Sequence, residues 1–351
     1  MNRRTIGILI PTLKKGGAEK QAALLASVLK NDYRVVMIVM APDSGMEEEN
    51  MEIASLPIGD MITLSGGIIS QIRQLYFVLK RNRIDTLFCY LTRPDIIGPI
   101  IGRMAGVKTI YQGLRNAELP KAKLLLEKIG NEWADGAIVN NYAGEKIFFQ
   151  KGLRNMTVIP NCYPDPKSYT ERKDSRYITV ITVGRFVAQK DYHTAIAAVS
   201  KAMGNVDNLK FKIIGHGELE GQVRDWIKDF NIADRCEILI NPKNIMGHLL
   251  DADIYLSTSL FEGTSNSIME ALDASLPVVA TDVGDNCKLV EDGVNGFLTG
   301  TGDVDTIANR LEKLAADRVL RLDMGREGNA ILKRDFSMEA FKSRYMELLE
   351  V

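Results

Sequence analysis

Two glutamates, Glu262 and Glu270, stand eight positions apart in the stretch FEGTSNSIMEALD. Between them lie four residues of the types that cap helix N-termini: Thr264, Ser265, Asn266 and Ser267. A structural interpretation is that Ser267 and Glu270 form a capping box, since they have its spacing. A functional interpretation is that free N–H groups at the helix start bind phosphate, while the two carboxylates accept hydroxyl groups of an attached sugar. This stretch by itself supports both interpretations equally.

Two cations, Arg185 and Lys190, lie in the segment VGRFVAQKDYHTA, between a predicted strand and a predicted helix. Arginine offers a planar fork to phosphate oxygens and lysine a point charge, so the pair suits a diphosphate. The alternative is that both are solvated surface cations. Because ligands bind at the carboxyl ends of strands in doubly wound sheets, we favour the functional interpretation.

Glycines follow two other predicted strands. The segment LKKGGAEKQ carries Gly16 and Gly17, and the segment IIGHGELEG carries Gly215 and Gly217. The first segment has the glycine spacing of neither a dinucleotide-binding loop nor a P-loop, so binding of a dinucleotide or ATP is not indicated there. Tight turns explain both pairs, and so does the close approach of a ligand to the backbone. His216 is expected to be a loop residue rather than a catalyst.

Short apolar runs alternate with helical patterns along the whole chain, which predicts parallel sheets covered by helices on both faces. Predicted strands of the first half are residues 5–10, 34–39, 85–90, 108–112, 136–140 and 156–160. Those of the second half are residues 177–183, 209–215, 236–241, 253–258 and 277–281. We therefore expect an α/β protein with two doubly wound sheets.

A proline-rich, charged segment without periodicity, residues 160–176, is the natural linker between two domains. We expect a first domain over 1–160, a linker over 161–176, a second domain over 177–335 and a final helix over 336–351. The first 160 residues carry a net charge of +6 and the remainder −7. A basic first half suits an anionic partner such as a phosphorylated substrate or a lipid surface, although the halves could also differ by chance. No basic run is interleaved with aromatic residues, so nucleic acid is not an expected partner.

Composition also bounds the cellular location. No apolar run approaches the ~18 residues that a membrane-spanning helix requires, and the apolar run before Pro11 is too short for a signal peptide. Four widely separated cysteines fit neither a disulfide framework nor a zinc site: Cys89, Cys162, Cys236 and Cys287. The expectation is a cytoplasmic protein, with peripheral contact to the inner face of the cytoplasmic membrane through its basic first domain.

The order and spacing of these features resemble the glycosyltransferases of family 4. The features are Arg185 with Lys190, Gly215 with Gly217, Glu262 with Glu270, and the stretch PVVATDVGDNCKLVEDGVNGFL that follows. The resemblance is strongest over residues 180–300; in the first half it involves mainly Gly16 and Gly17. It implies the GT-B fold, in which two Rossmann-like domains face a cleft. It also implies an acceptor-binding first domain, a nucleotide-sugar-binding second domain, a C-terminal helix that packs back on the first domain, and transfer with retention without a metal or other cofactor.

The resemblance assigns roles residue by residue. Arg185 and Lys190 would hold the donor diphosphate, Glu262 would contact sugar hydroxyls beside the reacting carbon, and Glu270 would bond the ribose hydroxyls. Arg185, Lys190 and Glu262 would be catalytic. Further donor contacts would come from a set of small and polar residues: Gly17, Gly215, Gly263, Thr264, Ser265 and Asn266.

Departures from the family pattern affect four positions where glycine is usual: Asp191, Cys162, Ser275 and Asp285. All three histidines lie in the second half, whereas many relatives carry a first-domain histidine near the acceptor. The corresponding loops read YLTRPD and YQGLRN, so the expected acceptor residues are Arg93, Arg115 and Asn116, together with Gly16.

The expected reaction moves a hexose or N-acetylhexosamine from a nucleotide sugar, UDP favoured over GDP, to a glycan or lipid-linked acceptor in bacterial surface polysaccharide synthesis. Cations and helix-terminus amides would stabilise the departing diphosphate. The DxD sequence at Asp251 and Asp253 is expected to be structural. Alternatives are a nucleotide-sugar epimerase of the same architecture, which would turn over donor without acceptor, and an inactive nucleotide-sugar-binding subunit. A glycoside hydrolase would not need the diphosphate-binding cations.

Overall fold

The computed structural model describes residues 3–13, 17–40, 56–115, 120–169 and 175–350. The chain forms two compact units, Met1–Pro164 with Met338–Val351, and Asp165–Ser337. The described part of the segment expected as linker is thus divided between the units, with Pro164 in the first and Asp165 in the second. Helix α14 (Met338–Glu350) belongs to the first unit, although it follows the second in the chain.

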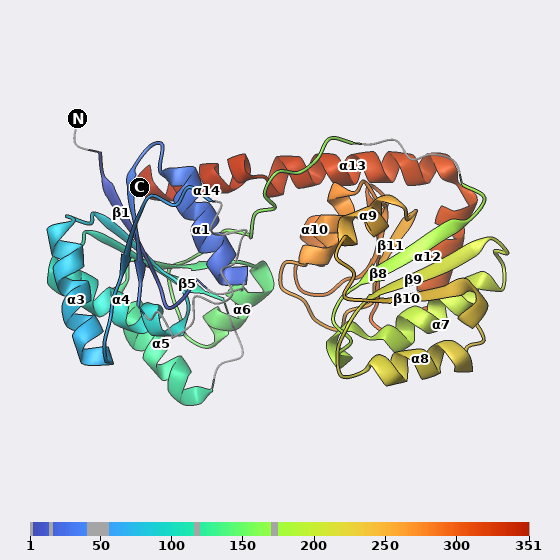
Figure 1. Cartoon of the computed structure of the whole chain (residues 1–351), viewed down its shortest axis with the longest axis horizontal. Helices are drawn as coiled ribbons and strands as arrows, with labels where there is room; N and C mark the ends of the chain where they lie inside the picture. The colour runs from blue at the N-terminus through green and yellow to red at the C-terminus, as the bar shows by residue number, and fades with distance from the viewer. Residues whose placement is uncertain (1–2, 14–16, 41–55, 116–119, 170–174, 351) are drawn as a thin grey trace. The chain divides into compact units, whose positions relative to one another are not determined.

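The first unit contains a seven-stranded parallel sheet in the order β3-β2-β1-β4-β5-β6-β7 (Figure 1). Its strands are β1 (Thr5–Ile10), β2 (Arg34–Val39), β3 (Asp60–Thr63), β4 (Thr86–Cys89), β5 (Thr109–Leu114), β6 (Gly136–Val139) and β7 (Met156–Val158). Strand β3 was not predicted from the sequence. It is a short edge strand with mostly exposed side chains, and therefore lacks the apolar run that marks the others.

Helices cover both faces of this sheet: α1 (Gly17–Leu29), α3 (Ile68–Arg81), α4 (Thr92–Ala105), α5 (Lys121–Trp133), α6 (Tyr142–Gln150) and α14. Because successive strand residues point to opposite faces, neighbours on β1 enter different cores. Ile8 packs in a cluster with Leu25 of α1 and Tyr345 of α14, whereas Leu9 packs with Leu75 of α3. The near-continuous apolar sequence of β1 follows from this double burial.

The second unit contains a six-stranded parallel sheet in the order β10-β9-β8-β11-β12-β13. The strands are β8 (Ile178–Val183), β9 (Leu209–Gly215), β10 (Cys236–Ile240), β11 (Ile254–Ser257), β12 (Val278–Thr281) and β13 (Gly296–Thr299). The helices are α7 (Tyr192–Met203), α8 (Glu220–Asp229), α9 (Ile245–Leu250), α10 (Asn266–Asp273), α11 (Asn286–Leu289), α12 (Val304–Ala316) and α13 (Arg318–Phe336). The expected α/β class with two Rossmann-like parallel sheets is confirmed.

Strand order reverses once in each sheet, between β1 and β4 in the first unit and between β8 and β11 in the second. Ligands of doubly wound sheets bind outside the carboxyl ends of the strands at such switch points. The segment with Arg185 and Lys190 follows β8, and the loop with Glu262 follows β11. Topology therefore brings together two segments that the sequence separates by about seventy residues.

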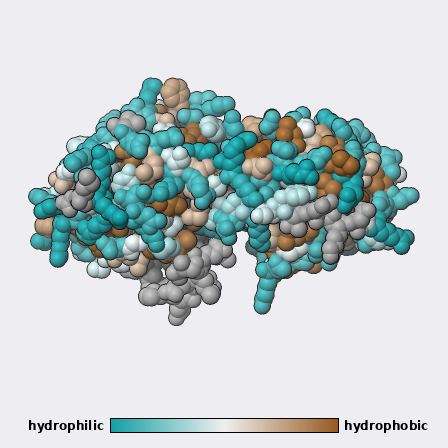
Figure 2. All heavy atoms as spheres, turned by 90° about the horizontal axis from the view of Figure 1, so that it is seen from above, coloured by the Kyte–Doolittle hydropathy of each residue, from teal (hydrophilic) through white to brown (hydrophobic). Residues whose placement is uncertain are grey.

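The surface view in Figure 2 is largely hydrophilic, with apolar residues in small separate groups. None of the helices in the described part of the chain combines the length and the apolar character that a membrane-spanning helix requires.

Candidate functional site

The loops after β8 and β11 are hydrogen-bonded to each other at the switch point of the second unit. A short 3₁₀ helix, Ala188–Lys190, is hydrogen-bonded to residues 258, 260 and 261. The bonds join Thr258 Oγ1 to Lys190 O (3.0 Å), Leu260 N to Gln189 O (2.8 Å) and Gln189 Nε2 to Phe261 O (2.8 Å). The two loops consequently act as one support for the side chains that they carry.

Lys190 and Glu262 form an ion pair on this support, in which Lys190 Nζ donates to Glu262 Oε1. The same oxygen accepts a bond of 2.8 Å from Ser259 Oγ. The side chains are only 19% and 10% exposed, so the pair lies in a less polar environment than a surface ion pair. Among the described residues no hydrogen bond reaches Glu262 Oε2, which leaves this oxygen able to accept a ligand hydroxyl. The predicted cation and carboxylate are thus adjacent.

Arg185 stands at the start of the same segment with an exposed side chain. It forms no ion pair with any residue that the structure describes. Its guanidinium is therefore available to a solvent-borne anion, whereas Lys190 is engaged by Glu262.

The start of α10 differs from the expected capping box. Ser265 is the N-cap, and its side chain accepts the N–H of Ile268 (3.5 Å). Helix α10 begins at Asn266, so Glu270 lies in the second turn and cannot close a box with Ser267. Several capping types in a row left the first position ambiguous in the sequence. The extended backbone of Ser265, with φ −75° and ψ 110°, identifies this residue as the N-cap.

Tyr255 of β11, which could not be singled out from the sequence, is close enough to both glutamates to feel their charge. Its ring is 1% exposed and its hydroxyl donates to Val183 O (3.3 Å). Burial raises the pKa of this phenol, and the carboxylates of Glu270 and Glu262 raise it further. Both carboxylates therefore act electrostatically on the same buried side chain. The only sequence signal was a tyrosine within the apolar run DIYLST.

Gly284, after β12, is a second residue that the sequence did not single out. Its φ is +58°, and an added Cβ would lie 2.0 Å from the backbone oxygen of Glu262. We expect Gly284→Ala to displace the Glu262 loop and to lower transfer about 100-fold, because small displacements of catalytic groups are costly. Initial rates and the melting temperature check this.

Gly293→Ala is the matched control for that substitution. Gly293 has a similar φ of +80° but no atom within 4 Å of an added Cβ. Both variants carry the ~1–2 kcal/mol strain of a left-handed alanine, and only Gly284→Ala carries the clash. Equal activities of the two variants would show that the contact with Glu262 does not matter.

Gly215 is buried under the neighbouring backbone. An added Cβ would lie 1.9 Å from Gly184 O, and the next loop is bonded to the same segment through Phe186 N and His216 O (2.7 Å). Close packing of two loops therefore explains why glycine stands here. Contact of Gly215 with a donor stays a prediction. His216 is exposed in the loop, as expected.

Two positions at which the family glycine is replaced keep a left-handed backbone. Asp191 has φ +45° and Ser275 has φ +57°. Asp191 also caps α7, accepting from Thr194 N (3.3 Å) and Thr194 Oγ1 (2.6 Å). Aspartate tolerates this conformation better than most residues and supplies the cap in addition.

The DxD sequence is structural, as expected. Asp253 Oδ2 accepts the N–H of Thr179 (2.8 Å) and thereby ties β11 to β8, while Asp251 ends α9. Within the described residues there is no group of three or more histidines, cysteines or carboxylates with the geometry of a metal site.

Expected acceptor residues of the first unit are only partly described. Gly16 and Asn116 lie outside the described residues. Arg93 is exposed near the start of α4. Gly17, which was predicted as a donor contact, is the first residue of α1, and an added Cβ there would meet no atom within 4 Å. Arg115 is held more firmly: its guanidinium lies 5.0 Å from the ring centroid of Tyr90 and donates to Asn161 Oδ1 (3.0 Å).

Beside Arg115 lies a buried pair of acids that sequence reasoning missed, Asp95 of α4 and Glu127 of α5. They are 1% and 2% exposed. Asp95 Oδ1 accepts the N–H of Gly113 (2.9 Å). Burial raises the pKa of Asp95, and the nearby carboxylate of Glu127 raises it further. Burial raises the pKa of Glu127 to about 7, against a hydrogen bond from Thr92 that lowers it.

This burial predicts a pH-dependent stability. The unfolded chain releases the Glu127 proton near pH 4.5 and the folded chain near pH 7. Between these values the folded state binds more protons, so the free energy of unfolding falls as pH rises, by on the order of 3 kcal/mol. We expect Glu127→Gln to melt near the wild-type temperature at the acid end of this window and above it at the alkaline end. The exposed Glu132→Gln on α5 is the control; a pH-independent difference for Glu127→Gln would contradict the assignment.

Comparison with known proteins assigns the class. Residues 167–330 match the family model of group 1 glycosyl transferases. The whole chain superposes on HepE from Anabaena in complex with UDP, with a TM-score of 0.81 at 19% identity over 99% of both chains. The fold is therefore that of the GT-B glycosyltransferases.

Sequence relatives agree with this class. Lipopolysaccharide core biosynthesis glycosyltransferase LpsE of Rhizobium meliloti is 29% identical over 170 residues, so the match spans about half of each protein. The GalNAc-alpha-(1->4)-GalNAc-alpha-(1->3)-diNAcBac-PP-undecaprenol alpha-1,4-N-acetyl-D-galactosaminyltransferase of Campylobacter jejuni is 23% identical over 356 residues, 98% of both chains. The family-model match over residues 167–330 and both sequence relatives point to the same class, so the protein is a glycosyltransferase.

Proposed function

We propose that this protein transfers a hexose or N-acetylhexosamine from a nucleotide sugar, bound by the second unit, to a glycan or lipid-linked acceptor, bound by the first. The observation that carries the proposal is the Lys190–Glu262 pair at the β8/β11 switch point. A cation for the diphosphate and a carboxylate for sugar hydroxyls are both needed at one place, and this pair supplies them. The Campylobacter relative, whose acceptor is linked to PP-undecaprenol, supports a lipid-linked acceptor, and the Rhizobium relative, a lipopolysaccharide core biosynthesis enzyme, supports a role in bacterial surface polysaccharide synthesis.

UDP is the favoured nucleotide, because HepE binds UDP on the same fold. Arg185 and Lys190 contact the diphosphate, and the amides of residues 263–266 lie at the start of α10, where N–H groups favour phosphate and sugar oxygens. Glu270, one turn further on, bonds the ribose hydroxyls. Gly215 borders the donor site without contributing a side chain, and a donor contact of Gly17 stays a prediction.

The proposed chemistry follows from these positions. As the bond from the anomeric carbon to the diphosphate breaks, negative charge develops on the leaving group, and Lys190, Arg185 and the α10 amides stabilise it without a metal. Glu262 holds hydroxyls beside the reacting carbon. The acceptor hydroxyl attacks from the face that the diphosphate leaves and passes its proton to that phosphate, so the configuration is retained, as in family 4.

A thermal-shift panel with UDP, GDP and ADP tests the donor assignment. A ligand at ~100 times its dissociation constant stabilises the folded state by about 2.7 kcal/mol. We expect UDP to raise the melting temperature by several degrees, and Glu270→Ala to lose most of this shift because the ribose contact is gone. The absence of a shift with all three nucleotides would refute nucleotide-sugar binding.

We also propose peripheral membrane contact through α5 and the segment after α6. Four apolar side chains on α5 are 38–61% exposed: Leu125, Leu126, Ile129 and Trp133. The sequence of residues 123–130 favours a core-facing helix with solvated basic flanks over contact with lipid, and the exposure of Leu125, Leu126 and Ile129 shows that this interpretation is wrong for them. In α3, by contrast, Leu75 and Leu79 are buried as a core-facing helix requires.

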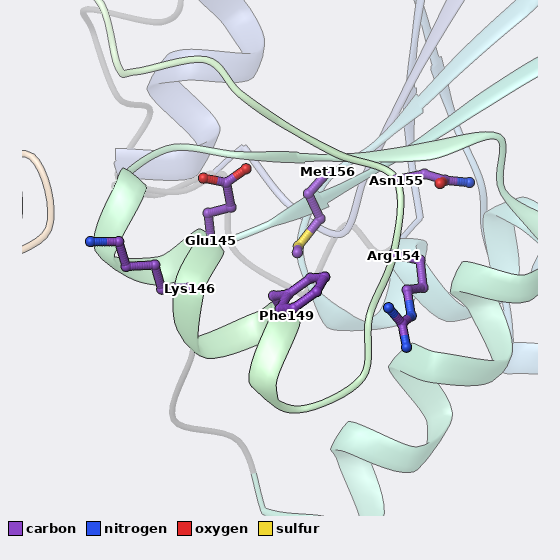
Figure 3. A pocket seen from close by; sticks show the side chains of 6 residues that line it. All are labelled: Glu145, Lys146, Phe149, Arg154, Asn155 and Met156. Carbon is purple, nitrogen blue, oxygen red and sulfur yellow. The ribbon is translucent and has the colours of Figure 1, made fainter.

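Cations accompany the exposed apolar side chains, as binding to anionic lipid requires. Asn131 of α5 bonds the backbone of Arg154, whose guanidinium lies 5.3 Å from the ring centroid of Phe149. Figure 3 shows Phe149 and Arg154 with Lys146 around a hollow between α6 and β7, whose volume is ≈ 460 Å³. We expect the protein to float with phosphatidylglycerol vesicles and a Leu125→Glu, Leu126→Glu variant to stay behind; equal flotation of the two would refute the contact.

A further inference from the structure

A small pocket lies in the first unit at the carboxyl ends of β4 and β5, beside the switch point between β1 and β4. Its lining includes Thr92, Asp95, Arg115 and Glu127, with the apolar Leu91 and Phe148. Nothing in the donor site of the second unit requires these groups, so their burial around a cavity calls for a separate explanation.

Two polar atoms of this pocket have no partner. Glu127 is 2% exposed, and its Oε2 is buried without a hydrogen bond from any described residue. The same holds for Nε of Arg115. Buried polar atoms in folded proteins are almost always satisfied, because an unsatisfied one destabilises the folded state. One acceptor and one donor left open in one cavity are the arrangement expected where a ligand completes the bonds.

The walls of the pocket are fixed by hydrogen bonds. Gln112 Nε2 donates to the backbone oxygens of Asp95 (2.8 Å) and Glu127 (3.2 Å), which holds α4 and α5 at the end of β5. Leu91, between β4 and α4, has φ +72°, a left-handed conformation that is strained for leucine. Such strain concentrates at functional sites. The cavity is therefore preorganised.

Size and chemistry define what fits. The cavity is ≈ 30 Å³, which admits a group of the size of a water molecule and excludes a phosphate or a whole sugar ring. A hydroxyl group both donates and accepts, so it can bond a carboxyl oxygen and a guanidinium N–H at once. Because the pKa of Glu127 is raised to about 7, its carboxyl is substantially neutral near neutral pH and suits a neutral ligand.

We propose that the pocket between Arg115 and Glu127 binds one hydroxyl group of the acceptor sugar, with Glu127 Oε2 accepting from it and Arg115 Nε donating to it. The assignment rests on the proposed transferase function, for which it specifies how the acceptor is positioned. It adds Glu127 and Thr92 to the acceptor side and gives Arg115 a defined partner, whereas exposed Arg93 has no part in it.

Binding of methyl glycosides of N-acetylgalactosamine, N-acetylglucosamine, galactose and glucose to the intact chain, measured by ligand-observed NMR, tests the proposal. For a glycoside that binds, the monodeoxy analogues are then compared. We expect one analogue to bind about tenfold more weakly than its parent, as the loss of one buried hydrogen bond implies. Glu127→Met should weaken the parent by a similar factor and leave that analogue unaffected. Glu132→Met, at an exposed position of the same helix, should match the wild type.

Equal binding of the parent glycoside to wild type and Glu127→Met would overturn the proposal, as would a panel in which no single hydroxyl depends on Glu127. Arg115→Lys keeps the charge and removes the Nε donor, and it gives the same test if Glu127→Met does not fold. The two proposals fail in different measurements. If no nucleotide shifts the melting temperature, the transferase proposal is refuted, whatever the glycoside binding shows.

Discussion

Replacing Glu262 with alanine lowers the turnover number for sugar transfer by about 100- to 1000-fold, the loss typical of removing one group that acts on the transition state. Glu262 is held in place by Ser259 and Lys190, both of which bond its Oε1. Its removal deprives the sugar of a positioned acceptor and leaves the diphosphate contacts intact. The affinity for UDP should therefore be unchanged or higher, since Lys190 no longer has a competing partner.

Initial-rate kinetics and a UDP thermal shift on the same preparation check this expectation. Glu237→Ala is the control, because Glu237 pairs with Lys212 (3.5 Å) in the same unit, away from the switch point. That variant should behave as the wild type in both measurements. An unchanged turnover number in Glu262→Ala would remove Glu262 from the catalytic set.

Replacing Lys190 with alanine weakens UDP binding about 10- to 100-fold, the loss expected for a charge-assisted hydrogen bond to phosphate. Turnover falls as well, because the cation stabilises the charge that develops on the leaving group. Calorimetric titration with UDP and single-turnover rates measure the two effects. Lys212→Ala is a control matched in burial, since both lysine side chains are 19% exposed. UDP affinity that is equal in the two variants would contradict the role of Lys190.

Lys190→Ala also leaves the carboxylate of Glu262 without its cation in a site that is mostly shielded from water. We expect a loss of stability of about 1–3 kcal/mol, because an uncompensated charge in such a site is costly. The double variant with Glu262→Ala should regain much of this stability while remaining inactive. This non-additivity distinguishes the contribution of the pair to folding from its contribution to transfer.

Much of the architecture was predictable because it depends on local pattern. Strands buried on both faces require near-continuous apolar runs, and β1, β2 and β8 carry them. Edge strand β3 was missed for the converse reason, since its side chains remain largely exposed. The loops that carry Lys190 and Glu262 could also be placed, because each follows a predictable strand. The roles of residues 263–266 and Glu270 toward a donor remain predictions.

The class of fold and the two charged loops could therefore be predicted from the amino-acid sequence. Which groups meet became evident only in three dimensions: Lys190 with Glu262, Gly284 against the Glu262 backbone, and Asp95 with Glu127 beside Arg115. These contacts join residues that are far apart in the chain, and each partner has an ordinary neighbourhood in the sequence. Whether a carboxylate is exposed, paired or buried depends on the elements that pack around it, and the order of strands in the sheet settles that packing.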